Sequence, residues 1–323
     1  MMSSFFDIGL SEHLGKKNQL VKLGMLLDWG RFSVILQGVH KEDGPTGYDT
    51  LKMFKSLLLG QWHSLSDPGL EQSLRVRLDF LDFSGFSLGD NLPDDTTFCR
   101  FRNKLIKQNK FDALFDEVNR QLEGLGLKVK SAEVAIVDAT IINANARPRK
   151  VLEPAGDENY TTKYSADPDA RWLKKGNKFY FGYRVFARSD AEGFIDKATA
   201  RPANLPETKQ LDAMTNDLKK GTRLNADKGF FSAENKAMLR RKGLKNGLMY
   251  KAFRNKPLTK RMSQFNKLIS KTRWRIEQCF GTIKRRFSYQ KASYFTTEKV
   301  DAQFKMKAMC LNLLKAINKV EFA

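Results

Sequence analysis

The chain has 323 residues, of which 41% are hydrophobic and 29% charged, and these proportions are ordinary for a globular protein of one or two domains. No apolar run approaches the roughly 20 residues that cross a bilayer, and the first residues lack the basic and apolar regions of a signal peptide. We therefore expect a cytoplasmic protein without membrane contact. Three cysteines and three histidines are too few and too scattered for a zinc knuckle or a disulfide framework.

The net charge of +21 comes entirely from the second part of the chain. Residues 1–130 hold 17 basic and 17 acidic residues, whereas residues 131–323 hold 40 basic and 19 acidic residues. Between Lys236 and Ala292 there are 18 basic residues and a single acid, with aromatic residues among them. Such an unbalanced tract indicates a groove for a polyanion, nucleic acid before membrane, and the ordinary alternative is a solvated basic face.

The chain begins with segments that predict helices. Residues 1–45 are interpreted as an arm with a short apolar strip, and residues 46–130 as a helical domain. Apolar residues at helical spacing predict a helix over residues 50–65. Pro68 is placed to start a second helix, which is expected to end before Gly85.

A third helix is predicted over residues 97–110, where small polar residues in front of it can cap its free amides. It carries no acid, and four of its basic residues are candidate DNA contacts: Arg100, Arg102, Lys104 and Lys107. A basic helix that follows two others is typical of a helix-turn-helix-like domain, so residues 46–130 are predicted to read DNA. The alternative is a surface helix that keeps the domain soluble.

Residues 131–323 have the pattern of an α/β domain. A run of β-branched and small residues over 133–144 predicts a buried central strand, and strands over 178–190 and 194–205 predict a hairpin. Residues 146–176, between the first two of these strands, are predicted to be a loop. After the hairpin we predict, in chain order, a helix over 207–219, a strand over 223–226, a helix over 233–242, a strand over 247–253 and two helices over 260–286 and 300–318. This order is typical of a ribonuclease-H-like α/β fold.

Two acidic residues of this domain lie in unusual places. Asp138 interrupts the apolar central strand, where a carboxylate is costly unless it pairs with a buried cation or binds a metal ion. Asp227 follows a short strand where the chain turns toward a helix, and such strand ends line the functional crevice of α/β sheets. Both are therefore candidates for a metal site.

Glu277 is the single acid of the basic tract and lies in the predicted long helix. With 3.6 residues per turn, Arg273 lies one turn before it and Lys284 two turns after it, so the three side chains share a face. A simple surface pair between Arg273 and Glu277 is the alternative. An average surface helix, however, would carry several acids.

Three hard oxygen ligands from separate elements suit Mg²⁺ or Mn²⁺. Two such ions can activate an attacking oxygen and stabilise a leaving oxygen during displacement at phosphorus. The sequence therefore predicts Asp138, Asp227 and Glu277 as catalytic residues and as the ligands of two ions. Serine–histidine catalysis and ATP use are poor alternatives, because the three histidines lie in the first third of the chain and no GxxxxGK[ST] loop is present.

Three segments resemble those of a known family. IVDATIINA, LNADKGF and RWRIEQCFGTIKRRF are similar to the three acidic signatures of DDE-type bacterial insertion-sequence transposases, in the group called insertion sequence five. The third signature runs Tyr, two residues, Arg, three residues, Glu, six residues, Lys. Arg273, Glu277 and Lys284 fit it, whereas Ser270 stands at the Tyr position, a departure that concerns contacts to DNA and leaves the metal ligands intact. Upstream, LPDDTTFCRFRNKL resembles the group's helical N-terminal domain.

The resemblance, over about residues 45–318, implies a ribonuclease-H-like catalytic domain after an α-helical N-terminal domain, with two divalent ions at the three acids. It implies a bacterial, nucleoid-associated transposase that cleaves double-stranded DNA at terminal inverted repeats and joins the freed 3′-hydroxyl to target DNA. Holding two ends together suggests a homodimer. Candidate phosphate contacts near the metals are Arg273, Lys284, Arg285 and Arg286. Two alternatives stay open: a transposase-derived DNA-binding protein without catalysis, and a nuclease without a joining step.

Overall fold

The computed structural model describes residues 13–39, 47–128, 133–148, 150–154, 160–164 and 166–321, and two of these segments, 150–154 and 160–164, as backbone only. The chain forms two compact units, which we call the helical unit (Met1–Leu127 with Lys305–Ala323) and the sheet unit (Lys128–Phe304). Helix α11 (Thr297–Ile317) contributes residues to both. The domain predicted over residues 131–323 therefore extends beyond the sheet unit, which ends at Phe304, because the residues from Lys305 onward belong to the helical unit. Across the described segments, no helix is long and apolar enough to span a bilayer.

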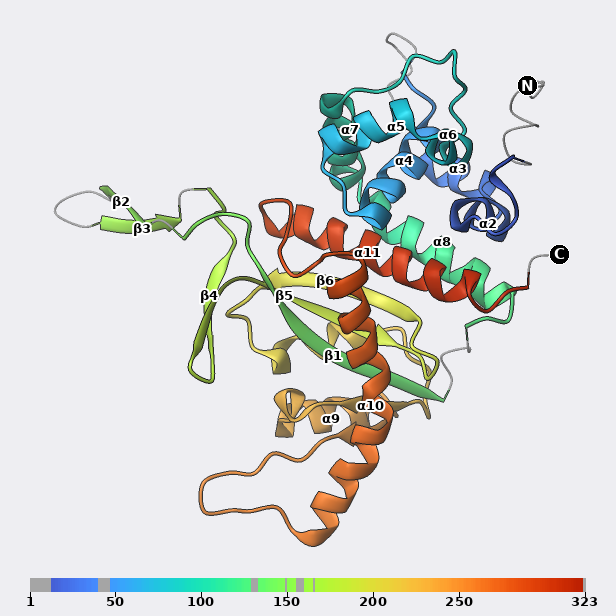
Figure 1. The fold of residues 1–323 in the computed structure, drawn as a ribbon. Coiled ribbons are helices and arrows are strands. Elements are labelled where there is room, and N and C mark those ends of the chain that lie inside the picture. The colour runs from blue at the N-terminus through green and yellow to red at the C-terminus, as the bar shows by residue number, and fades with distance from the viewer. Residues whose placement is uncertain are drawn as a thin grey trace. The chain divides into compact units, whose positions relative to one another are not determined.

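The part of the helical unit that precedes the sheet in the chain (blue to blue-green in Figure 1) is made of short helices. Before the sheet they are α2 (Gln19–Leu26), α3 (Gly30–Leu36), α4 (Thr50–His63), α5 (Asp67–Val76), α6 (Leu78–Ser84), α7 (Asp95–Lys107) and α8 (Lys110–Gly124). The predicted arm is wrong where it is described, because Leu23, Phe32 and Leu36 of α2 and α3 are buried in a core. The rest of the predicted arm, residues 1–12 and 40–45, lies outside the described residues.

Two of the three predicted helices of this unit are confirmed, as α4 and α7, and both have a side-chain cap. Asp49 accepts the amides of Leu51 and Lys52, and Asp94 accepts that of Thr97 at 2.6 Å. The second predicted helix is instead divided at Arg77 into α5 and α6, because that residue is extended.

Arg102 does not belong to the exposed basic face of α7, which corrects its prediction as a DNA contact. It is buried, and its guanidinium donates two hydrogen bonds to Asp67, in the first turn of α5, at 2.8 and 2.7 Å. This bidentate pair joins α5 to α7. Arg100, Lys104 and Lys107 are exposed on the same helix.

The sheet unit contains a sheet with the ribonuclease-H-like strand order, which confirms the predicted fold class. Strand β1 (Val134–Asn143) lies between β5 (Lys178–Ser189), which is antiparallel to it, and β7 (Arg223–Ala226), which is parallel. Strand β6 (Ile195–Pro202) pairs with the far side of β5, and β8 (Lys245–Leu248) is parallel to β7. The hairpin of β5 and β6 and the strand β7 lie where the sequence predicts them.

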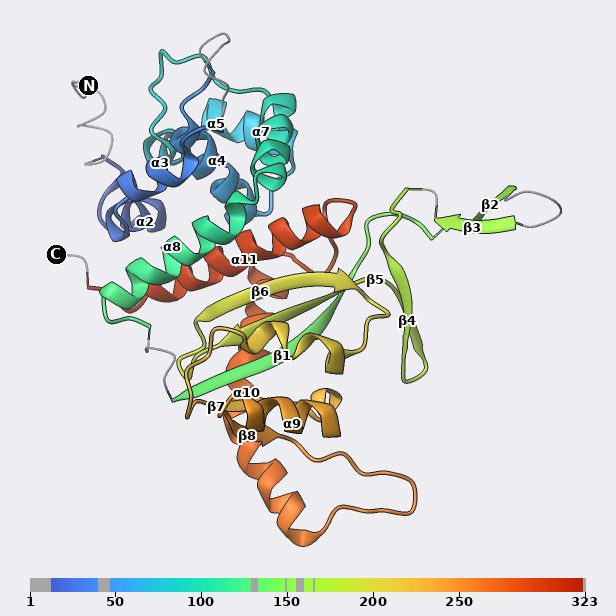
Figure 2. The ribbon, with the colours of Figure 1, turned by 180° about the vertical axis from the view of Figure 1, so that it is seen from behind.

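Helices cover both faces of this sheet. The long helix α10 (Lys260–Arg286) crosses one face, and α9 (Ala233–Arg241) lies on the other, as the two opposite views show (Figures 1 and 2). The core on the α9 side is formed by buried residues from β1, β5, β7, β8 and α9, among them Val137, Phe186, Ala226 and Leu239. Both helices match their predicted ranges to within a residue, and α11 begins three residues before its predicted start.

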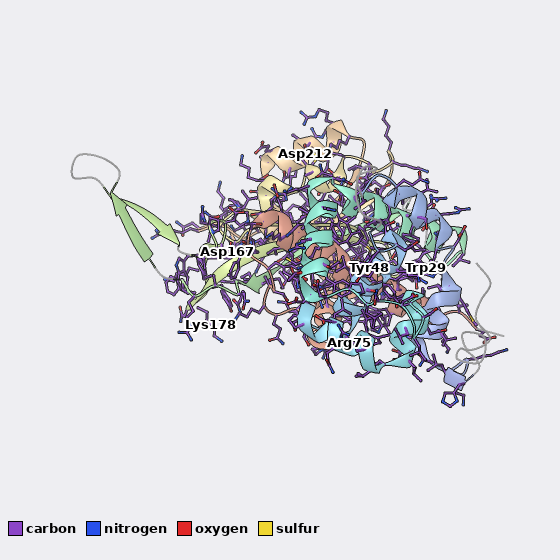
Figure 3. All side chains as sticks on the ribbon, turned by 90° about the horizontal axis from the view of Figure 1, so that it is seen from above. Trp29, Tyr48, Arg75, Asp167, Lys178 and Asp212 are labelled. Carbon is purple, nitrogen blue, oxygen red and sulfur yellow. The ribbon has the colours of Figure 1, made fainter. Side chains whose placement is uncertain are left out.

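The predicted loop over residues 146–176 contains strands. Strand β4 (Arg171–Lys175) pairs with the first residues of β5, which extend beyond the part of β5 that pairs with β1. Two further strands, β2 (Lys150–Pro154) and β3 (Tyr160–Tyr164), pair with each other. Exposed Lys178 lies at the turn between β4 and β5, at the margin of the unit (Figure 3). The sequence showed no apolar alternation here, because these strands are largely solvent-exposed or project from the sheet.

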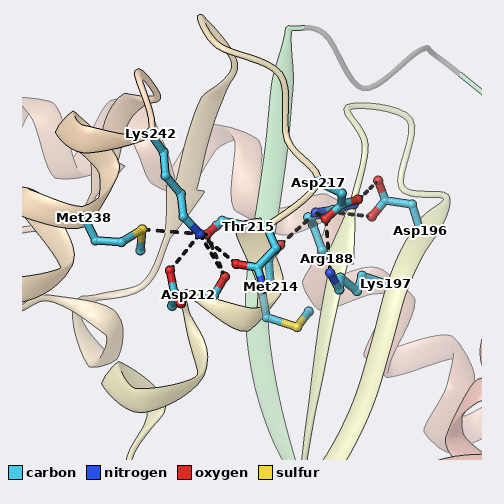
Figure 4. Close-up of polar contacts among 10 residues, drawn as sticks. Arg188, Asp196, Lys197, Asp212, Met214, Thr215, Asp217, Met238 and Lys242 are labelled. Carbon is cyan, nitrogen blue, oxygen red and sulfur yellow. Dashed lines mark hydrogen bonds and ion pairs between the residues drawn. The ribbon is translucent and has the colours of Figure 1, made fainter.

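The helix predicted over residues 207–219 is wrong. The chain forms two short 3₁₀ helices there, η1 (Glu207–Gln210) and η2 (Ala213–Thr215). Side chains from other elements bond to carbonyls that an α-helix would use: Arg188 donates to the Met214 carbonyl at 2.7 Å, and Lys242 to the Asp212 carbonyl at 3.2 Å (Figure 4). Tertiary hydrogen bonds therefore replace helical ones in this segment.

The strand predicted over residues 247–253 is shorter and starts earlier, as β8. Its partner β7 has four residues, so the parallel pairing ends at Ala226 and Leu248. Beyond it, the backbone N–H and C=O of Tyr250 both bond to the side-chain amide of Asn266 in α10, at 2.8 and 3.0 Å. The backbone groups of Tyr250 that would pair with β7 in a longer strand are therefore already bonded to Asn266.

We expect Arg102→Ala to lower the free energy of unfolding by about 2 kcal/mol, because it leaves the Asp67 carboxylate without its bidentate partner. The expected loss is below that of a fully buried pair, since the Asp67 side chain remains 21% exposed. Arg100→Ala, an exposed arginine of the same helix, should stay within about 0.5 kcal/mol of the parent. Urea unfolding measures both, and equal stabilities of the two variants would contradict a structural role for Arg102.

Candidate active site

Strands β1 and β7 place two carboxylates side by side at one face of the sheet. Val137 and Ala226 are register partners across the parallel pair, and both belong to the core on the α9 side. Because side chains alternate along a strand, Asp138 points to the opposite face, where α10 lies. Asp227 is the residue directly after β7, at its carboxyl end. The parallel register therefore brings Asp138, in the middle of β1, next to Asp227 at the end of β7.

Helix α10 brings the third carboxylate. The side chain of Thr259 caps its first turn, and its inner face buries Ile269, Ile276 and Ile283 at helical spacing. The long apolar stripe fixes which side of the helix faces the sheet. Glu277 and Arg273 lie one turn apart on that side or at its edge, with Arg273 buried and Glu277 58% exposed.

Two polar contacts fix α10 along its length. Near its middle, the Asn225 side chain of β7 donates to the Thr272 hydroxyl at 2.8 Å. In its last turn, Lys284 Nζ donates to the Thr140 hydroxyl at 2.7 Å and to the Ile141 carbonyl at 3.0 Å, both in β1. These contacts tie the helix to the two strands that carry Asp138 and Asp227. The predicted common face of Arg273, Glu277 and Lys284 therefore faces the acidic strands.

Arg273 is the point on which the three acids converge. Its Nη2 lies 2.8 Å from Asp138 Oδ2 and 3.3 Å from Glu277 Oε1, and its Nη1 lies 3.4 Å from Asp227 Oδ1. One guanidinium thus contacts three carboxylates from β1, from the end of β7 and from α10. The carboxylates of Asp138 and Asp227 also each accept the amide of the residue that follows them.

Burial and charge oppose each other in this cluster. Burial raises the pKa of Asp138 above its ordinary value, and the positive charge of Arg273 offsets that effect only in part. For Arg273, burial lowers the pKa, but the charges of Asp138, Asp227 and Glu277 outweigh it and hold the pKa above its ordinary value. Arg273 Nε is buried and has no acceptor among the described residues. In the pair of Asp138 and Arg273, burial therefore still disfavours the charged carboxylate, and one guanidinium nitrogen lacks an acceptor among the described residues.

The donor set has the chemistry of a site for a hard divalent cation. Asp138, Asp227 and Glu277 offer carboxylate oxygens, the ligands that Mg²⁺ and Mn²⁺ prefer, and they already gather around one positive charge. With Arg273 among them, no three His, Cys, Asp or Glu side chains of the described chain are arranged as a group that could hold a metal. By the type of their donor atoms, the residues present fit such an ion.

The other predicted DNA contacts lie in two different environments. Arg285 and Arg286, at the end of α10, are exposed at the surface. Lys284 is half-buried, and burial together with the charge of Lys175 lowers its pKa. Arg273 is buried against the acids. In this structure Arg273 and Lys284 therefore bind protein groups.

Two residues of the site were absent from the sequence prediction. Asn225 precedes Asp227 by two positions, so strand alternation alone could have placed it on the same face. Glu207 belongs to the 3₁₀ helix η1, and its charge interacts with those of Asp138 and Asp227. No sequence signal marks Glu207, because its position depends on tertiary contacts of the segment after β6.

The pKa of Asp138 gives a prediction for stability without divalent ions. Since folding raises this pKa above its ordinary value of 3.8, the stability linked to the protonated carboxyl is fully present below pH 3.8. It is lost as the pH rises through the folded-state pKa. Asp138→Asn cannot ionise, so its free energy of unfolding relative to the parent should be higher at pH 7 than at pH 4. Chemical unfolding at both pH values measures this difference, and a difference that falls with pH would contradict it.

Comparisons with known proteins agree with the geometry. A model of the transposase DDE domain matches residues 130–313, and a model of a transposase domain (DUF772) matches residues 9–104. The chain is similar to the transposase for insertion sequence element IS1106 of Neisseria meningitidis serogroup B. The two are 46% identical over 226 residues, which cover 69% of this chain and 78% of the relative.

Two solved structures are similar at low sequence identity. A piggyBac transposase in a synaptic complex with hairpin DNA is 9% identical, with a TM-score of 0.40 over 97% of this chain and 74% of that one. The Mos1 strand transfer complex is 11% identical, with a TM-score of 0.28 over 89% of this chain and 82% of that one. The family follows from the sequence matches alone. Because the DDE-domain match spans more than half of the chain and a 46% identical relative covers 69% of it, the chain belongs to the DDE-domain transposases.

Proposed function

We propose that this transposase cleaves double-stranded DNA at the terminal inverted repeats of a mobile element and joins the freed 3′-hydroxyl to target DNA. One observation carries the proposal: Asp138, Asp227 and Glu277, from three separate elements, converge on a single buried guanidinium at 2.8 to 3.4 Å. An ordinary surface ion pair would not need three partners from β1, β7 and α10. The order and types of these acids agree with the DDE family to which the chain belongs.

Asp138, Asp227 and Glu277 are the proposed ligands of two Mg²⁺ or Mn²⁺ ions. When bound, such ions activate the attacking oxygen and stabilise the leaving oxygen of a phosphodiester. The three acids differ in what they supply. Asp138 is a rigid ligand in the middle of a strand, with its side chain 14% exposed, whereas Glu277 is 58% exposed and open toward substrate. The positive charge of the buried Arg273 side chain partly offsets the three negative charges and holds the carboxylates close to one another.

DNA is the proposed partner of both units. Exposed Arg285 and Arg286 extend the basic surface at the end of α10 and are the proposed phosphate contacts of the sheet unit. Exposed Arg100, Lys104 and Lys107 of α7 are the proposed contacts of the helical unit with the element ends. Because two ends must be held together for transposition, we propose a homodimer on DNA.

The catalytic assignment is tested by strand transfer of an oligonucleotide duplex that carries the terminal inverted repeat, in Mg²⁺. We expect Asp138→Asn and Glu277→Gln each to lower the rate by more than about 100-fold, because each removes a charged ligand of the ions. Glu234→Gln, an exposed carboxylate of α9 with an 81% exposed side chain, is the matched control and should retain the parent rate. Undiminished transfer by either active-site variant would refute the assignment.

The products of the same assay separate the alternatives. Joined products support a transposase, whereas cleavage without joining would identify a nuclease. Binding of the duplex without any nicking in Mn²⁺ would identify a DNA-binding descendant of a transposase.

The phosphate contacts predict a change in the salt dependence of DNA binding. Replacing both Arg285 and Arg286 by Ala should reduce the slope of log K against log salt by about 2, since each lost phosphate contact releases about 0.9 fewer counterions. Arg31→Ala serves as a control, because Arg31 already pairs with Asp28 at 3.2 Å. Fluorescence anisotropy with a labelled duplex measures the slopes. An unchanged slope in the double variant would show that these arginines do not contact phosphates.

A further inference from the structure

Gly229 lies two residues after Asp227 and leaves room for another carboxylate. A Cβ atom at this position would lie 1.7 Å from Glu207 Oε2 and 2.9 Å from Glu207 Cδ. The backbone of Gly229 is not in the left-handed region, so its conformation does not demand glycine. The absent side chain therefore matters because it lets the Glu207 carboxylate lie against the segment that carries Asp227.

The segment that carries Glu207 is fixed by buried polar contacts. The side-chain amide of Asn235 in α9 donates to the Thr208 carbonyl at 3.1 Å and to the Phe230 carbonyl at 2.8 Å. This single amide joins η1 to η3 (Lys228–Phe230), the turn that contains Gly229. Further along, Arg188 and Lys242 hold residues 212–217 (Figure 4). The fold therefore fixes the chain directly after Glu207.

The charge of Glu207 is only loosely compensated. Its nearest arginine nitrogen, Arg184 Nη1, is 3.7 Å from Glu207 Oε1, beyond hydrogen-bond distance, and donates instead to the Leu205 carbonyl at 2.8 Å. Burial raises the pKa of Glu207, and the charges of Asp138 and Asp227 add to this despite the opposing charges of Arg184 and Lys175. A bound cation would stabilise the ionised form of such a carboxylate, whose charge is opposed by two other acids and whose arginine partner lies 3.7 Å away.

We infer that Glu207 is a fourth carboxylate of the active centre and strengthens the binding of a divalent cation by Asp138 and Asp227. The inference rests on the proposed function and extends it, because the three acids of the DDE pattern come from β1, β7 and α10, whereas Glu207 comes from η1. Affinity for hard cations rises with the number of carboxylates that face them. Gly229 then has a functional role: it keeps that carboxylate next to Asp227.

The test is binding of Mn²⁺ to the full chain without DNA, measured by electron paramagnetic resonance of the free ion and by calorimetry. Glu207→Gln keeps the shape and removes the charge, and it should weaken Mn²⁺ binding by about 10-fold. Gly229→Ala keeps Glu207 but displaces its carboxylate, the far end of a flexible side chain, and should weaken binding to a similar extent. In the double variant the two losses should not add, because both act on one carboxylate.

Two controls separate this inference from the proposed function. Glu133→Gln, an exposed carboxylate just before β1, should bind Mn²⁺ as the parent does. Asp227→Asn should lose Mn²⁺ binding if the proposed centre exists. Parent-like binding by Glu207→Gln, with binding lost in Asp227→Asn, would overturn the role of Glu207 and leave the proposed function intact. Parent-like binding by Asp227→Asn would overturn the proposed centre and the inference with it.

Discussion

The contact of Arg273 with three carboxylates is the interaction on which the proposed active centre depends. The carboxylates come from β1, from the end of β7 and from α10, which lie far apart in the chain. Like charges at such short range repel one another, so the strands and the helix could not present them together without a cation. A buried guanidinium meets this requirement in the folded protein, and the same carboxylates are the proposed ligands of divalent ions. The buried Arg273 guanidinium therefore reduces the repulsion among the three carboxylates in the folded protein.

The fold supplies the precision that this contact needs. Parallel register sets Asp138 beside Asp227, because Val137 pairs with Ala226. The position of α10 is then fixed by its apolar face, by Asn225 bonding to Thr272 and by Lys284 bonding to β1. On the opposite side of the sheet, Asn235 joins the segment of Glu207 to the turn after Asp227. Rigid elements thus hold every proposed ligand, which limits the reorganisation required at the moment of reaction.

Elements with a strong local pattern could be predicted from the sequence. The β-branched run around Asp138 forms the central strand β1, and the stripe of Ile276, Phe280 and Ile283 forms the inner face of α10. Asp138 and Glu277 also lie in distinctive local contexts, the first within an apolar strand and the second within a basic tract, whereas the prediction of Asp227 depends mostly on the family resemblance. What depends on distant contacts could not be predicted. The composition of residues 207–219 favours a helix, but the segment forms 3₁₀ turns whose carbonyls bond to Arg188 and Lys242. Glu207 belongs to the first of these turns, so its position also depends on tertiary contacts. Arg102 likewise has the spacing of a DNA contact on α7 but pairs with Asp67 in another helix.

The most direct measurement of the central claim is a crystal structure of the full chain soaked in Mn²⁺, with anomalous scattering used to locate the ion. We expect an anomalous peak bound by Asp138 and Asp227, with Glu277 beside it, and a longer separation of Arg273 from Asp138 than the present 2.8 Å. Ions found only elsewhere on the protein, with Arg273 still in contact with all three carboxylates, would contradict a divalent-metal centre at these residues.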